Sequence, residues 1–219
     1  RKTMKYKNIL WDWNGTLIDD VGVALEAVNI MLERRSLPII NIGQYYSYVD
    51  TPIIRFYEKC FDMTKDDEGT LLPEYQRLYA ELAQELPKND TTYKTVKALQ
   101  DKRFRQFIVS SCEQNILNDW LARYGITHFF EAVTGADNLC AESKTERAIH
   151  LMENYGLEPS ETVFVGDTAH DFDTAKALGV DALLVTYGHQ SPEENRNTGC
   201  VTADSLDEVL AILTNDANE

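Results

Sequence analysis

The first apolar run of the chain begins at Ile9 and ends in a carboxylate, Asp12. A short apolar segment of this kind is typical of a buried strand. The Asn14-Gly15 pair that follows predicts a turn. An Asp at this place commonly caps a turn, but a carboxylate just past a buried strand also lies where open α/β sheets bind their ligands. The feature therefore favours an α/β fold with a candidate site at Asp12.

Later parts of the chain repeat this pattern of an apolar run followed by polar side chains. The polar residues are Ser110 and Ser111 after an apolar run at 107–109, Lys144 at a predicted helix start, and Asp167 and Asp171 after an apolar run at 162–165. If the strands are neighbours, Asp12, Asp167 and Asp171 converge at one edge of the sheet. Oxygen ligands without clustered His or Cys favour Mg²⁺ over zinc. Helix capping by Asp167 and Asp171 is the alternative interpretation.

The order of predicted elements indicates two parts. Apolar residues recur at helical spacing from Val21 to Leu32, and further helices are predicted at 44–49, 51–60 and 71–86. Beyond residue 88 helices and strands alternate, with strands at 104–110, 129–133, 163–166 and 182–186, which predicts a parallel sheet with helices on both faces. We therefore expect an α/β, Rossmann-like parallel-sheet core domain (residues 1–17 and 88–219) with an inserted helical cap domain (residues 18–87).

Composition excludes several classes of partner. The formal net charge of −15 argues against nonspecific binding to nucleic acid or to an anionic membrane. No apolar stretch approaches the roughly 20 residues of a membrane span, and the polar N-terminal segment predicts no signal peptide. Four widely spaced cysteines without a C-x-x-C motif indicate reduced thiols in a cytoplasmic protein. The sequence carries no signal for an oligomeric state.

With these motifs in this order, the sequence resembles the haloacid dehalogenase superfamily of phosphohydrolases over most of its length. It looks most like the branch of phosphoglycolate phosphatases and β-phosphoglucomutases. The resemblance implies a Mg²⁺-dependent phosphohydrolase whose helical cap closes over the site. Because a cap encloses little volume, the substrate would be a small phosphorylated metabolite, a phosphomonoester.

The resemblance also implies roles for individual residues. Asp12 would be the nucleophile that forms an aspartyl-phosphate, and it would share the metal with Asp167, Asp171 and the backbone carbonyl of Asn14. Ser110, Ser111 and Lys144 would hold the phosphate, with Lys144 also pairing with Asp12. In the cap, Arg55 near Tyr45, Tyr46 and Tyr48 is a candidate for substrate binding, although such side chains more often pack the lobe.

Asn14 departs from the family pattern. Phosphatases of this family usually have Asp two residues after the nucleophile, as general acid and base, and an amide can neither give nor take a proton in that way. The rival interpretation is therefore a catalytically weakened phosphate-binding or regulatory protein. A receiver-type signalling domain disagrees with the helical insertion, and Cys112 lacks a supporting histidine motif for nucleophilic catalysis. His170 and His189 are either surface residues or part of the site mouth.

Overall fold

The computed structural model describes residues 5–137 and 143–214. Six strands form one sheet in the order β3-β2-β1-β4-β5-β6, and each pair of neighbours is parallel. The strands are β1 (Asn8–Trp11), β2 (Arg105–Glu113), β3 (Ala132–Ala136), β4 (Thr162–Gly166), β5 (Asp181–Val185) and β6 (Val201–Ala203). This is the doubly wound arrangement, so the predicted α/β, Rossmann-like fold class is confirmed.

β1 lies at the centre of the sheet and all four of its residues are buried. Trp11 is in register with Ile108 of β2 and Val165 of β4, so the three strands end close together. The chain continues outward from β1 through β2 and β3, then returns to the other side at β4. In open α/β sheets this reversal of strand order creates a crevice at the carboxyl ends of the strands. Asp12 and Asp167 follow the two strands that border this crevice.

Helices cover both faces of the sheet. One hydrophobic core joins Ile9 and Trp11 of β1 to α5 (Asp90–Asp101), α6 (Gln114–Tyr124) and α10 (Leu206–Thr214). The other joins Leu10 of β1 to α7 (Lys144–Tyr155) and α8 (Ala169–Leu178). The alternation of Ile9, Leu10 and Trp11 between the two cores follows from the two-residue period of a strand. A short helix, α9 (Pro192–Asn197), precedes β6.

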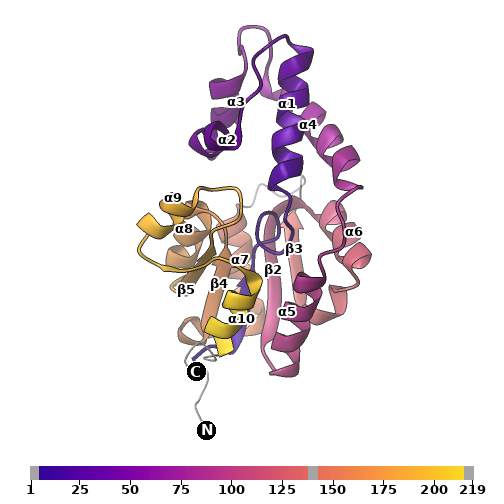
Figure 1. Cartoon of the computed structure of the whole chain (residues 1–219). Coiled ribbons are helices and arrows are strands. Elements are labelled where there is room, and N and C mark those ends of the chain that lie inside the picture. Colours follow the sequence, from indigo (N-terminus) through magenta and orange to yellow (C-terminus); the bar gives the residue numbers. More distant parts are fainter. Residues whose placement is uncertain (1–4, 138–142, 215–219) are drawn as a thin grey trace.

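Four further helices form a separate helical lobe between β1 and α5. They are α1 (Val21–Arg34), α2 (Ile42–Tyr48), α3 (Ile54–Cys60) and α4 (Glu68–Ala83). They pack round a hydrophobic cluster of their own, which Leu82 links to the core below. Figure 1 shows the lobe standing beyond the ends of the strands, with α1 leading away from the sheet and α4 returning towards it. The lobe therefore faces the edge of the sheet at which Asp12 lies.

Several predicted helix boundaries in this lobe were wrong by up to three residues. The helix expected at 44–49 runs from Ile42 to Tyr48, since Asn41 caps it through the Gln44 N–H. The helix expected at 51–60 begins only at Ile54, because the Pro52 carbonyl accepts the Arg55 N–H in a turn that precedes it. The helix expected at 71–86 runs from Glu68 to Ala83, since Asp67 caps it through the Thr70 N–H.

None of the helices in the described residues combines the length and apolar character needed to cross a membrane. Cys140, one of the four cysteines, lies outside the described residues.

Candidate active site

Asp12 follows β1 directly and is 6% exposed. Its backbone N–H donates a 2.8 Å hydrogen bond to the Val165 carbonyl, so the loop is fastened to β4 where it leaves the sheet. Trp11 and Trp13, on either side, are fully buried in the core. The apolar residues of the motif thus fix the backbone before and after the carboxylate, which places Asp12 at the end of the central strand.

Lys144 provides the positive charge beside Asp12. It is the first residue of α7, where Ser143 and Glu146 form a reciprocal capping box. Its Nζ lies 2.6 Å from Asp12 Oδ1 and 2.7 Å from Asp171 Oδ1, and all three side chains are buried. Burial disfavours the charged amine, but the two carboxylates outweigh this and raise the pKa of Lys144. Burial also raises the pKa of Asp12, against the opposing effect of Lys144.

Asp171 acts both as a helix cap and as a member of the site. Its Oδ2 accepts the backbone N–H groups of Asp167 and Thr168 at the start of α8, while its Oδ1 pairs with Lys144. Burial works against its charge, but Lys144 and these donors outweigh it and lower the pKa of Asp171. The capping interpretation therefore holds for Asp171 without excluding a role in the site.

Asp167 lacks the lysine that compensates the other two carboxylates. Its carboxylate accepts the backbone N–H of His189 at 2.7 Å, and no lysine or arginine in the described part of the chain pairs with it. Burial and the nearby charge of Asp12 outweigh the opposing effect of His189 and raise the pKa of Asp167 well above its usual value. A buried carboxylate in this position is costly unless a further positive charge joins it.

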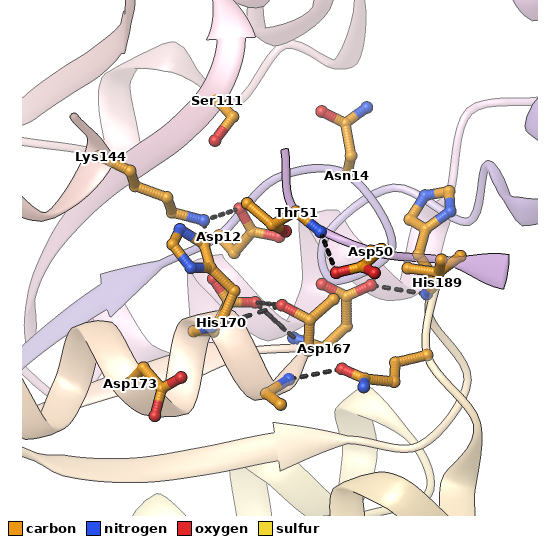
Figure 2. Close-up of a pocket in the computed structure, with 15 residues that line it drawn as sticks. Asp12, Asn14, Asp50, Thr51, Ser111, Lys144, Asp167, His170, Asp173 and His189 are labelled. Carbon is orange, nitrogen blue, oxygen red and sulfur yellow. Dashed lines mark hydrogen bonds and ion pairs between the residues drawn. The ribbon is translucent and has the colours of Figure 1, made fainter. Parts of the chain in front are cut away.

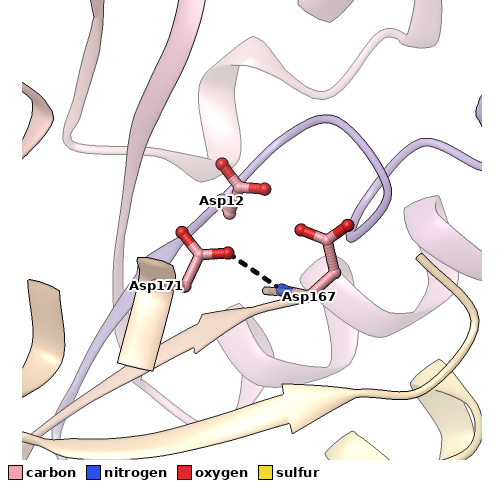
Figure 3. A group of neighbouring side chains, drawn as sticks. All are labelled: Asp12, Asp167 and Asp171. Atoms are coloured by element: carbon pink, nitrogen blue, oxygen red, sulfur yellow. Dashed lines mark hydrogen bonds between the residues drawn. The ribbon is translucent and has the colours of Figure 1, made fainter. Parts of the chain in front are cut away.

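The carboxylates of Asp12, Asp167 and Asp171 gather at the ends of β1 and β4 (Figure 3). One oxygen from each lies within 4.8 Å of the others, as the ligands of a single ion would. The donor set consists of oxygen alone, which suits a hard cation such as Mg²⁺. A bound cation would also supply the positive charge that no lysine or arginine of the described residues gives to Asp167. These three residues could therefore hold a divalent cation.

Gly188 leaves the space that Asp167 occupies, because a Cβ at this position would overlap the Asp167 carboxylate. Gly188→Ala should displace that carboxylate and weaken Mg²⁺ binding by about tenfold or more, the usual effect of disturbing the support of a metal ligand. The rise in Tm on titration with Mg²⁺ measures this. Gly22→Ala is the control, because a Cβ at Gly22 of α1 meets no other atom. Equal Mg²⁺ responses of the two variants would contradict the placement.

A pocket of about 490 Å³ opens at these carboxylates, as Figure 2 shows. Its floor includes Asp12 and Lys144, and its wall includes residues 49–51 from the loop between α2 and α3. The helical lobe thus contributes directly to the lining. Except for Lys144, no lysine or arginine among the described residues lines the pocket.

The remaining predicted residues take different positions. Ser111 lines the pocket, whereas the buried Ser110 accepts the backbone N–H of Cys112 with its Oγ. Arg55 is exposed on α3, outside the described lining, with its guanidinium 3.9 Å from Asp50, which does line the pocket. The roles of Ser110 and Arg55 stay predictions. Cys112 is a poor nucleophile, because burial raises the pKa of its thiol to about 12.

The structure adds residues that no motif indicated, Asp20 of the loop after β1 and Tyr79 of α4. Both hydrogen-bond to the Asn14 amide. His189 lines the pocket rather than lying on the surface, with Nε2 2.8 Å from Asp20 and Nδ1 2.8 Å from the Tyr45 hydroxyl. Burial works against its charge, but Asp20 outweighs this and raises the pKa of His189 to about 9.

Comparison with known proteins identifies the family of this chain. Residues 9–185 match the family model described as haloacid dehalogenase-like hydrolase. A phosphoglycolate phosphatase of Vibrio parahaemolyticus is 28% identical, over 94% of this chain and 96% of the relative. One from Pseudomonas syringae is 26% identical, over 90% of this chain and 76% of the relative.

Solved structures share the fold at lower identity. A haloacid dehalogenase-like family hydrolase from Streptococcus pneumoniae has a TM-score of 0.80 at 18% identity, with 94% of this chain and 98% of that chain covered. Protein Tyrosine Kinase A of Mycobacterium tuberculosis has a TM-score of 0.76 at 20% identity, with 95% and 98% covered. The family model spans most of the chain and includes all four motifs, so the family predicted from them is confirmed: the chain belongs to the haloacid dehalogenase-like hydrolases.

Proposed function

We propose that this chain is a Mg²⁺-dependent phosphatase that hydrolyses a small phosphomonoester through an aspartyl-phosphate on Asp12. One observation carries the proposal: a buried carboxylate at a pocket floor, paired with Lys144 at 2.6 Å, beside two further carboxylates that can share a cation. The names of the relatives support a phosphatase and make phosphoglycolate a candidate substrate. They also favour a working enzyme over a weakened regulatory protein.

In the first step, an Asp12 oxygen attacks phosphorus and forms a new P–O bond. The bond from phosphorus to the ester oxygen breaks, and its electron pair leaves with that oxygen as an alkoxide or aryloxide. Splitting the hydrolysis into two displacements is the advantage of covalent catalysis. Lys144 holds Asp12 in place and adds positive charge beside the transferred group, while Ser111 faces the same pocket. We assign Ser110 and Arg55 supporting roles in phosphate and substrate binding.

When bound, Mg²⁺ would neutralise the carboxylates and provide positive charge for the phosphate oxygens. Asp12, Asp167 and Asp171 would hold it, with the Asn14 carbonyl as a further ligand. We propose that the helical lobe, within residues 18–87, acts as the cap that encloses the substrate. The pocket volume of about 490 Å³ suits a small molecule. The unpaired thiols of Cys60, Cys112 and Cys200 agree with a cytoplasmic location.

Mg²⁺ should raise both stability and activity. A ligand that binds only the folded state at about 100 times its Kd stabilises that state by about 2.7 kcal/mol, so Tm should rise by several degrees. Asp167→Asn should reduce this rise, and EDTA should abolish phosphate release. Turnover that survives EDTA would contradict the metal assignment.

A panel of phosphomonoesters, with and without Mg²⁺, tests the proposed function. It should include phosphoglycolate, alkyl phosphates whose alkyl group carries no charge, and an aryl phosphate. The comparison tests whether the pocket accepts a second anionic group, because Lys144 is the only lysine or arginine in the described lining. Phosphate release above that of the Asp12→Asn variant supports the proposal. Binding of phosphate without release from any ester would support the regulatory alternative.

A further inference from the structure

Asp20 makes an unusual set of contacts for its position. It is the N-cap residue of α1, yet its side chain makes no capping hydrogen bond. The carboxylate is 1% exposed and instead contacts Asn14 Nδ2 at 2.9 Å, the Gly15 N–H at 2.8 Å, the Tyr79 hydroxyl at 2.6 Å and His189 Nε2 at 2.8 Å. These four contacts form what we call the Asp20 cluster. The Asp20 carboxylate therefore hydrogen-bonds to residues around the site instead of capping its own helix.

The Asp20 cluster determines which way the Asn14 amide faces. Asn14 Nδ2 lies 2.9 Å from Asp20 Oδ2 and 3.2 Å from the Tyr79 oxygen, so both amide hydrogens have an acceptor. A carboxylate only accepts hydrogen bonds, so the nitrogen and not the oxygen of the amide must face Asp20. Asn14 also lines the pocket, and Figure 2 shows its amide oxygen on the side of Ser111. An acceptor without a proton to exchange is thereby presented to the pocket.

Tyr79 connects this arrangement to the helical lobe. It belongs to α4, and its hydroxyl donates to Asp20 while accepting from Asn14. Tyr45 of α2 makes a second connection, with its hydroxyl 2.8 Å from His189 Nδ1. Both tyrosines reach the cluster from the lobe. One of the two acceptors of the Asn14 amide, the Tyr79 hydroxyl, therefore comes from the lobe.

We propose that Asp20 and Tyr79 are positioning residues that hold the Asn14 amide oxygen as the hydrogen-bond acceptor for the water that hydrolyses the Asp12 phosphate. The inference rests on the proposed function. In this step water adds to phosphorus, and the P–O bond to Asp12 breaks with its electron pair left on the carboxylate. Both protons of the water end on the released phosphate, as H₂PO₄⁻. Asn14 orients the water but takes no proton.

Tyr79→Phe tests this, because it removes the hydroxyl while keeping the ring. We expect kcat for an aryl phosphate to fall about tenfold, the equivalent of one net hydrogen bond in the rate. KM should fall with kcat, because the slowed step is hydrolysis of the accumulated phosphoenzyme, so kcat/KM should stay unchanged. Added to Asn14→Ala, the same change should have no further effect, since the amide it orients is gone. An equal loss in both backgrounds would overturn the proposal, as would no loss in either. Tyr75→Phe, on the same helix, is the control, because Tyr75 donates no hydrogen bond to Asp20 or Asn14 in the described structure.

The side-chain amide signals of Asn14 give a second readout that needs no turnover. These two NMR signals are assigned by their loss in Asn14→Ala. In Tyr79→Phe one should shift and exchange faster with water, whereas Tyr75→Phe should leave both unchanged. Unchanged signals in Tyr79→Phe would overturn the proposal. If the wild-type protein hydrolyses no ester, the proposed function fails and the water-positioning role with it; turnover without coupling of Tyr79 to Asn14 refutes this inference alone.

Discussion

Asp12→Asn should lower kcat by a factor on the order of 10⁴ or more, the scale of removing a catalytic nucleophile. The amide keeps the shape of the side chain but cannot form the aspartyl-phosphate. The fold should survive, because Lys144 retains Asp171 at 2.7 Å and one of three crowded carboxylates is removed. Steady-state kinetics on an aryl phosphate, together with Tm, separate the two effects.

Asp19→Asn is the matched control for this variant. Asp19 is exposed and lies in the same loop, so its loss changes the net charge equally without touching the site. It should keep the activity of the wild-type protein. Full activity in Asp12→Asn, or an equal loss in Asp19→Asn, would contradict the role of Asp12.

Exchanging Asn14 and Asp20 should have the second largest effect. General acid–base catalysis is worth roughly 10²–10⁴ in rate, and the wild-type chain has no carboxyl group at position 14. Expulsion of an alkoxide should therefore be slow, whereas an aryl leaving group, which departs without a proton, should suffer less. The variant with Asn14→Asp and Asp20→Asn places a carboxyl group there, so alkyl phosphate turnover should rise by about 10² or more.

The exchange also explains why the single variant is a weaker test. Asn14→Asp alone would set two carboxylates about as close as the present 2.9 Å contact, which destabilises the buried Asp20 cluster. We expect it to raise alkyl phosphate turnover less than the exchange does, with a lower Tm. Intact mass must be checked first, because an Asn-Gly pair such as Asn14-Gly15 can deamidate and produce the same change. If both variants of confirmed mass lose alkyl turnover, another group moves the proton and Asn14 is an adapted residue.

The fold could be predicted because the apolar runs that mark the strands end at the polar residues of the motifs. Apolar runs that end in polar side chains locate β1, β2 and β4, and the alternation of elements after residue 88 indicates a parallel sheet. Details that depend on packing were missed. The strand expected at 129–133 is β3 at Ala132–Ala136, because Phe129 packs against Tyr93 of α5 with ring centroids 5.4 Å apart. The short β6 and α9 gave too little periodicity to be recognised.

The site residues likewise fall into those that the sequence indicated and those that only the structure showed. Asp12, Lys144, Asp167 and Asp171 could be singled out because each belongs to a motif at a strand end or helix start, and the structure brings all four together. Asp20 and Tyr79 could not, since their contact spans 59 residues of sequence. The sequence named His189 for the site mouth or the surface without its partner, since its contact with Asp20 spans 169 residues. Asp20 lies near the first motif, but no feature of the sequence marked it as part of the site. Its burial and its four hydrogen bonds are properties of the folded chain.

Direct detection of phosphate on Asp12 is the most direct test of the account. The wild-type protein, mixed with Mg²⁺ and an aryl phosphate, is quenched in acid at successive times and its peptides are analysed by mass spectrometry. Because Asn14 cannot take a proton from the attacking water, we expect the intermediate to accumulate, with a burst of the aryl alcohol before the steady state. Phosphate should be found on Asp12 and be absent from Asp12→Asn. Steady release of phosphate without a burst, while Asp12 stays unmodified at all times, would contradict the account.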